Sequence, residues 1–111
     1  MSPPIHQTST YRQKDIDDFI YDYSRAGNPT RENLEINLAS LEGGTGAVAF
    51  SSGMAAVDSV MKLLKAGDHV VCSDDVYGGV SRLYNNLIVN YEISFTYVNS
   101  SNPQEVEDAI Q

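Results

Sequence analysis

The chain has 111 residues, and its 15 acidic side chains outnumber its 7 lysines and arginines, giving a formal net charge of -8. Binding to nucleic acid or to anionic membranes requires clustered positive charge, so this composition argues against both kinds of partner. With 41% hydrophobic residues, 20% charged residues and one cysteine, the sequence is typical of a soluble, cytoplasmic globular protein without an internal disulfide.

The first part of the chain is predicted to be irregular up to Pro29, because prolines open it and turn-forming residues close it. We see no signal-peptide pattern and no apolar run near the roughly 18 residues of a membrane span. A helix is predicted to follow Thr30, its N-cap, with leucines at helical spacing, and to end at Gly43. The apolar run 47–50 then predicts a short buried strand.

The second half alternates between helices and strands. Its predicted elements are a helix from Met54 that ends at Gly67, a strand at 69–72, a helix at 81–87, a strand at 93–98 and a helix beginning after Asn102. That last helix has Pro103 in its first turn and Glu105 as a capping-box acid. Because strands alternate with helices, the sequence predicts an α/β fold with a mainly parallel sheet. The uncapped last helix suggests part of a larger fold.

The junction from strand to helix at 50–56 is the first candidate for chemistry. A helix N-terminus carries free N–H groups and a partial positive charge, which together attract anions. Gly53 lets the backbone come close to a ligand, and Ser51 and Ser52 add hydroxyl groups. The alternative is an ordinary turn in which the serines only cap the helix.

The loop 21–31 is the second candidate. It places Arg25, whose guanidinium can form two hydrogen bonds to one phosphate, beside the hydroxyl of Tyr23. Glycine and proline give this loop a restricted shape. On composition alone, a solvated surface loop is an equally good interpretation.

The loop 74–79 is the third candidate, because it directly follows a predicted strand. Tyr77 in this glycine-rich loop can place its ring on a flat ligand at the carboxyl end of the sheet. Asp74 and Asp75 do not form a catalytic pair, since neighbouring residues of an extended chain point apart. Alternatively, the two acids cap the next helix and Tyr77 only packs.

Together, and in this order, the three stretches resemble the Cys/Met-metabolism family of pyridoxal-phosphate enzymes, which includes cystathionine γ-synthase and cystathionine γ-lyase. The resemblance runs from Pro4 to the helix after Pro103 and rests on the motifs Tyr-Ser-Arg-x-Gly-Asn-Pro-Thr, Ser-Ser-Gly-Met-Ala-Ala and Asp-Asp-Val-Tyr-Gly-Gly. It implies a partial three-layer α/β arrangement with a mainly parallel sheet, part of the large cofactor-binding domain of a fold-type I, aspartate-aminotransferase-like enzyme. Residues 1–30 would be an irregular arm and phosphate-binding loop, and residues 31–111 an incomplete pyridoxal-phosphate-binding domain.

The resemblance also implies site residues and partners, and it implies no metal. Gly53 and Met54 would donate backbone N–H groups to the phosphate of pyridoxal 5'-phosphate, and Tyr77 would stack on its pyridine ring. Tyr23 and Arg25 would reach across a subunit interface to the phosphate held by the neighbouring subunit. Family members are therefore homo-oligomers, usually dimers of dimers.

The chain also departs from the family pattern. It is several times shorter than family members and ends before the family's Schiff-base lysine, so we expect no catalytic residue in it. Its own lysines, Lys14, Lys62 and Lys65, show no spacing that indicates a desolvated amine. Gly79 stands where methionine γ-lyases of the family carry a cysteine, which disfavours that activity.

The implied function is that of a trans-sulfuration enzyme of the cystathionine γ-synthase or γ-lyase type, acting on a small amino-acid substrate. O-acetylhomoserine sulfhydrylase and cystathionine β-lyase are alternatives, since the family's discriminating residues lie mostly elsewhere. A further alternative is a non-catalytic, truncated product that at most associates with a full-length relative. A reading frame that continues beyond Gln111 to a Ser-x-Thr-Lys segment would support the enzyme, whereas a stop codon would support the truncated product.

Overall fold

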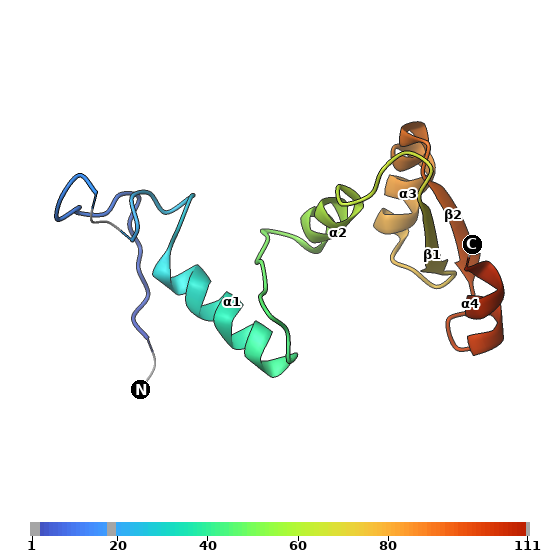
Figure 1. Cartoon of the computed structure of the whole chain (residues 1–111), viewed down its shortest axis with the longest axis horizontal. Helices are drawn as coiled ribbons and strands as arrows, with labels where there is room; N and C mark the ends of the chain where they lie inside the picture. Colours follow the sequence, from blue (N-terminus) through green and yellow to red (C-terminus); the bar gives the residue numbers. More distant parts are fainter. Residues whose placement is uncertain (1–2, 18–19, 111) are drawn as a thin grey trace. The chain divides into compact units, whose positions relative to one another are not determined.

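The computed structural model describes residues 3–17 and 20–110, and the chain divides into two compact units, Met1–Ala49 and Phe50–Gln111. The first unit contains irregular segments and the helix α1, whereas the second contains a parallel strand pair with helices around it (Figure 1). The predicted α/β class is therefore confirmed. Within the described ranges, every helix is too short or too polar to span a bilayer.

Helix α1, Pro29–Leu41, has Asn28 as its N-cap, and Oδ1 of this residue accepts a hydrogen bond from the Thr30 N–H at 2.8 Å. The prediction of Thr30 as the N-cap is therefore wrong. Pro29 takes the first helical position, where its missing N–H costs nothing and its fixed φ suits the helix. The helix ends at Leu41, and Gly43 terminates it as predicted by adopting the left-handed conformation, with φ 64°, just after the C-cap.

The strand predicted at 47–50 is not formed. These residues are irregular, and Val48 is 73% exposed. The Ala49 N–H, which a strand would give to a neighbouring carbonyl, donates to Oε1 of Glu35 at 2.8 Å. A short apolar run forms a strand only where a partner strand supplies the ladder of hydrogen bonds, so the prediction is wrong here.

The second unit has a helix–strand–helix–strand–helix order. Its elements are α2 (Gly53–Met61), β1 (His69–Ser73), α3 (Gly78–Asn86), the 3-10 helix η1 (Ile88–Tyr91), β2 (Ser94–Val98) and α4 (Pro103–Ala109). The two strands are parallel, with His69 opposite Ser94 and Ser73 opposite Val98. Parallel neighbours need a crossover connection, which α3 and η1 supply. The predicted strands and helices are present, although α2 ends at Met61, before the predicted end at Gly67, and α3 begins at Gly78 instead of Ser81.

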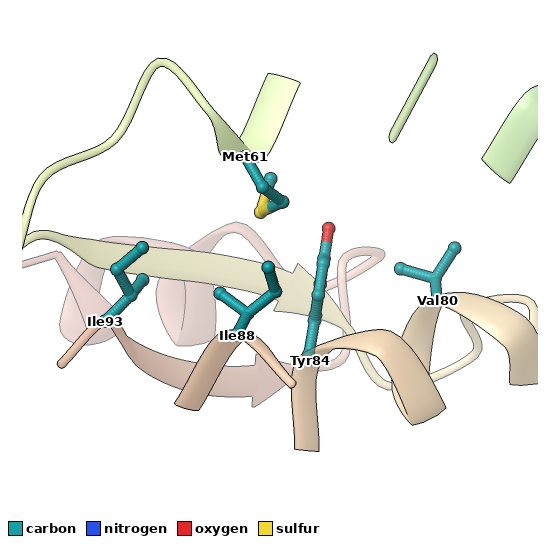
Figure 2. Close-up of a cluster of buried hydrophobic side chains, with 5 residues drawn as sticks. All are labelled: Met61, Val80, Tyr84, Ile88 and Ile93. Carbon is teal, nitrogen blue, oxygen red and sulfur yellow. The ribbon is translucent and has the colours of Figure 1, made fainter. Parts of the chain in front are cut away.

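The core of the second unit lies where α2, α3 and η1 meet the sheet. Its buried side chains are those of Met61, Val80, Tyr84, Ile88 and Ile93 (Figure 2). Figure 2 shows Met61 pointing from α2 toward Ile88 and Tyr84. From the strands, Val70, Cys72 and Phe95 pack against this cluster. The rings of Tyr84 and Phe95 stack with centroids 4.4 Å apart, which joins α3 to β2.

The start of α4 follows the local sequence signal closely. Oδ1 of Asn102 accepts a hydrogen bond from the Gln104 N–H at 3.2 Å, and Pro103 stands in the first turn. Glu105 acts differently from a capping-box acid. Its carboxylate accepts hydrogen bonds from the Asn102 side-chain amide at 3.0 Å and from the Asn99 N–H at 2.9 Å. The acid therefore stabilises the loop before the helix as well as the cap residue.

Candidate functional site

The turn that leads into α2 leaves two backbone donors free. Ser52 is the N-cap, and its Oγ accepts a hydrogen bond from the Ala55 N–H at 3.1 Å. The Ala56 N–H donates to the Ser52 carbonyl at 3.2 Å. The N–H groups of Gly53 and Met54 precede Ala56, the first N–H donor of the helical ladder, so within the described part of the chain they remain available to a ligand. A Cβ at Gly53 would meet nothing within 4 Å, which leaves the approach open.

The electrostatics of this turn favour an anion. The aligned peptide dipoles give a helix N-terminus a partial positive charge. The described first turn of α2 contains no acidic side chain that would oppose an anion. A compact anion such as a phosphate group is the ligand that this arrangement suits best.

Tyr77 lies beside the same helix start. It immediately precedes α3, and it is 71% exposed. A Cβ placed on Gly79 would lie 2.5 Å from Cε1 of Tyr77 and 3.1 Å from Sδ of Met54, so the ring and the thioether flank this glycine. Neither Asp74 nor Asp75 caps α3, whose N-terminus has no side-chain cap bond among the described residues. The structure therefore brings an exposed aromatic ring close to the side chain of Met54, the second residue of α2.

Tyr23 and Arg25 contact each other in the first unit. Cζ of Arg25 lies 4.7 Å from the centroid of the Tyr23 ring, in a cation–π arrangement. The Ala26 and Gly27 N–H groups donate to the Tyr23 carbonyl at 2.9 and 3.0 Å and close the turn. Both functional side chains remain exposed. The loop therefore presents a guanidinium and a phenol together, as a phosphate contact requires.

The same loop is tied to the N-terminal segment. Thr10 and Tyr23 form an isolated antiparallel bridge. The Ser24 N–H donates to the Ser9 carbonyl at 2.9 Å, and the Ser24 hydroxyl donates to the Thr8 carbonyl. Backbone bonds on this side therefore set the path of the chain through Tyr23.

Sequence reasoning did not assign a role to Arg31 or Glu35. Arg31 lies in the first turn of α1, and its guanidinium donates to the carbonyls of residues 24–26. Nε of Arg31 lies 3.7 Å from Oε1 of Glu35, one helical turn later. The i,i+4 spacing of the two residues indicates their pairing. The contact with the loop depends on the path of the chain, which no local spacing reveals.

The lysine and thiol groups at hand do not suggest a nucleophile. Nζ of Lys62 lies 2.7 Å from Oδ2 of Asp58, and this hydrogen bond raises the pKa of the lysine. Burial raises the pKa of the Cys72 thiol, which packs against the core. A protonated amine and a neutral thiol are both weak nucleophiles. No cluster of His, Cys, Asp and Glu suited to a metal occurs among the described residues.

A model of the family described as Cys/Met metabolism PLP-dependent enzyme matches residues 1–111. The chain belongs to this family. The resemblance seen in the three motifs is therefore confirmed over the full length of the chain. Pyridoxal phosphate is the cofactor on which the family depends.

Individual members of the Cys/Met metabolism family are between 38% and 48% identical to the chain. Cystathionine beta-lyase MetC of Staphylococcus haemolyticus is 48% identical over 111 residues, which cover 99% of this chain and 28% of the relative. Cystathionine gamma-lyase of Bacillus subtilis is 47% identical over 112 residues, covering 100% of this chain and 30% of the relative. The crystal structure of cystathionine gamma synthase from Xanthomonas oryzae pv. oryzae in complex with aminoacrylate and cysteine superposes with a TM-score of 0.84. It is 38% identical, and the match covers 97% of this chain and 28% of that chain.

These identities and coverages have two consequences. The chain spans about three-tenths of the length of the relatives that it matches. Two enzymes with different names, a cystathionine beta-lyase and a cystathionine gamma-lyase, are 48% and 47% identical to it. Family membership therefore follows from similarity, whereas the choice of reaction does not.

Proposed function

We propose that the protein is a pyridoxal-phosphate-dependent trans-sulfuration enzyme that acts on a sulfur amino acid or an O-acylhomoserine. The observation that carries the proposal is the match of the whole chain to the Cys/Met metabolism family. Within this class we favour the cystathionine γ-synthase and γ-lyase reactions. Cystathionine β-lyase is the second candidate, because a protein of that name is 48% identical to the chain. A cytoplasmic location is part of the proposal, since a single cysteine provides no internal disulfide.

The residues at the start of α2 fit the cofactor. The free N–H groups of Gly53 and Met54 would hold the phosphate, and the exposed Tyr77 ring, close to the Met54 side chain, would cover the flat heterocycle. When bound, pyridoxal phosphate supplies an electron sink for negative charge that develops next to the substrate amine. These residues bind and orient the cofactor. We propose residues 31–111 as part of its binding domain.

The loop with Tyr23 and Arg25 would provide the second half of the phosphate site. Its exposed guanidinium and phenol lie together on a turn that backbone hydrogen bonds restrain. In the proposed homo-oligomer, a dimer of dimers, this loop contacts the phosphate held by the neighbouring subunit. Residues 1–30 then form an arm and phosphate-binding loop.

The test uses the protein produced from the complete reading frame, with Arg25→Ala as the variant. Loss of a hydrogen bond from a charged group should weaken the binding of pyridoxal phosphate by roughly 1.5–3 kcal/mol. Titration of the apoprotein with the cofactor, followed by absorbance, measures this change. Unchanged cofactor affinity would exclude the assignment of this loop. Lys14→Ala, an exposed change in the same unit, serves as the control.

A further inference from the structure

Arg31 binds three consecutive carbonyl groups of the loop that carries Arg25. Its Nη2 donates to the Ala26 carbonyl at 2.9 Å, and its Nη1 donates to the Ser24 and Arg25 carbonyls at 3.4 and 3.5 Å. Carbonyl dipoles that point toward one place repel one another unless a cation lies there. The guanidinium therefore adds to the backbone hydrogen bonds that close this turn.

Glu35 holds this guanidinium from the opposite end. Its Oε1 lies 3.7 Å from Nε of Arg31 and accepts the Ala49 N–H at 2.8 Å. The side chains of Arg31 and Glu35 are 37% and 22% exposed, so the pair is partly shielded from water. An arginine fixed at Nε presents both terminal nitrogens in one plane, which suits several carbonyls at once.

The contacts divide the loop into an inner and an outer side. The carbonyls of Ser24, Arg25 and Ala26 are bonded to Arg31, whereas the side chain of Arg25 lies over the exposed Tyr23 ring. Groups that bind a ligand through side chains gain affinity when their backbone is already held in the bound arrangement. Arg31 thus holds the backbone of the loop, whereas the side chain of Arg25 remains exposed and can bind a ligand.

We propose that Arg31 is a positioning residue that pre-organises Tyr23 and Arg25 for the cofactor phosphate, with Glu35 fixing its guanidinium. The inference rests on the proposed function of this loop. Arg31 itself does not touch the phosphate. Its contribution to cofactor binding passes entirely through the loop whose carbonyls it holds.

The test is a double-mutant cycle in the protein from the complete reading frame. Arg31→Lys keeps the charge but replaces the fork with a single ammonium group, so cofactor affinity should fall about five- to thirty-fold. Arg25→Ala should lower it by roughly ten- to a hundred-fold. Because Arg31 acts through Arg25, the double variant should bind within about three-fold of Arg25→Ala alone. Arg12→Lys, the same change at an exposed position of the same unit, should leave affinity unchanged.

A second variant and a second measurement separate positioning from general stability. Glu35→Gln can still accept the Ala49 N–H but loses the charge beside Arg31, so it should weaken cofactor binding less than Arg31→Lys does. In the apoprotein, Arg31→Lys should increase amide exchange at Ala26 and Gly27 while the melting temperature changes by only a few degrees. Effects of Arg31→Lys and Arg25→Ala that add in full, or an Arg31→Lys variant that binds normally, would overturn the inference. If Arg25→Ala itself binds normally, the proposed function of the loop is wrong, and the inference falls with it.

Discussion

The ring of Tyr77 occupies the space into which a side chain at Gly79 would project. A Cβ at that glycine would lie 2.5 Å from Cε1 of the ring, closer than carbon atoms approach without displacement. Met54 Sδ, at 3.1 Å from the same point, closes the other side. The bare glycine therefore determines where the ring rests beside the N-terminus of α2.

Gly79→Ala should lower cofactor affinity several-fold with little effect on stability. Alanine favours the helical backbone of α3 by up to about 1 kcal/mol, whereas displacing the neighbouring ring costs about 0.5–1.5 kcal/mol. These terms nearly cancel in the free energy of unfolding, but the ring loses its position. Gly78→Ala is the matched control, because its Cβ would meet only Nη1 of Arg82, at an ordinary 3.6 Å. Equal cofactor affinities in the two variants would contradict the prediction.

Tyr77→Ala and Tyr77→Phe should separate stacking from packing. The side chain is 71% exposed, so neither change should lower the melting temperature by more than a few degrees. The Tyr77→Phe variant keeps the ring and should retain most of the cofactor affinity. The Tyr77→Ala variant has no ring and should lose most of this affinity. Thermal melts and cofactor titrations of both variants provide the measurement. Two destabilised variants with normal cofactor binding would instead support a packing role.

The sequence predicts those structural features that depend on adjacent residues, but not those that depend on residues distant in the chain. The cap at Asn102 follows from adjacent residues, and the structure contains it. The strand predicted at 47–50 required a partner, and without one the Ala49 N–H bonds to Glu35. The role of Arg31 could not be predicted for the same reason, because the path of the loop determines which carbonyls its guanidinium contacts. Motif residues such as Tyr77 could be named, but their proximity to Met54 could not.

Stability should decline above about pH 9. Burial raises the pKa of the Cys72 thiol from its usual 9.0, and burial, followed by the nearby thiol, raises the pKa of Tyr84 from its usual 10.0. The folded state therefore retains protons that the unfolded chain has already released. This contribution to stability is complete below pH 9 and is lost as the pH rises through the folded-state values. Melting temperatures between pH 7 and 10.5 measure the decline, which should be smaller in a Cys72→Ala, Tyr84→Phe double variant. An equal decline in this variant would contradict the prediction.

The 111-residue chain alone should not turn over cystathionine. A lysine reacts with the aldehyde of pyridoxal phosphate productively only when its amine is neutral and close by. Lys62 is held by Asp58 at 2.7 Å with its pKa raised, and Lys14 and Lys65 are exposed. Incubating the purified chain with the cofactor and borohydride, followed by peptide mapping, should show scattered, low-level labelling. Stoichiometric labelling of one lysine together with turnover would overturn the prediction.

The absence of burial in α1 determines how the chain responds to heat. Over its thirteen described residues α1 buries no side chain, and the buried hydrophobic residues that the structure describes lie between Met61 and Val98. The heat-capacity change of unfolding comes mainly from apolar surface that becomes hydrated. Its value for this chain should therefore be close to that of a domain of roughly sixty residues, about 0.7–0.9 kcal/mol/K, and below the value that the full length implies. Unfolding of the first unit should therefore add little to the heat-capacity change.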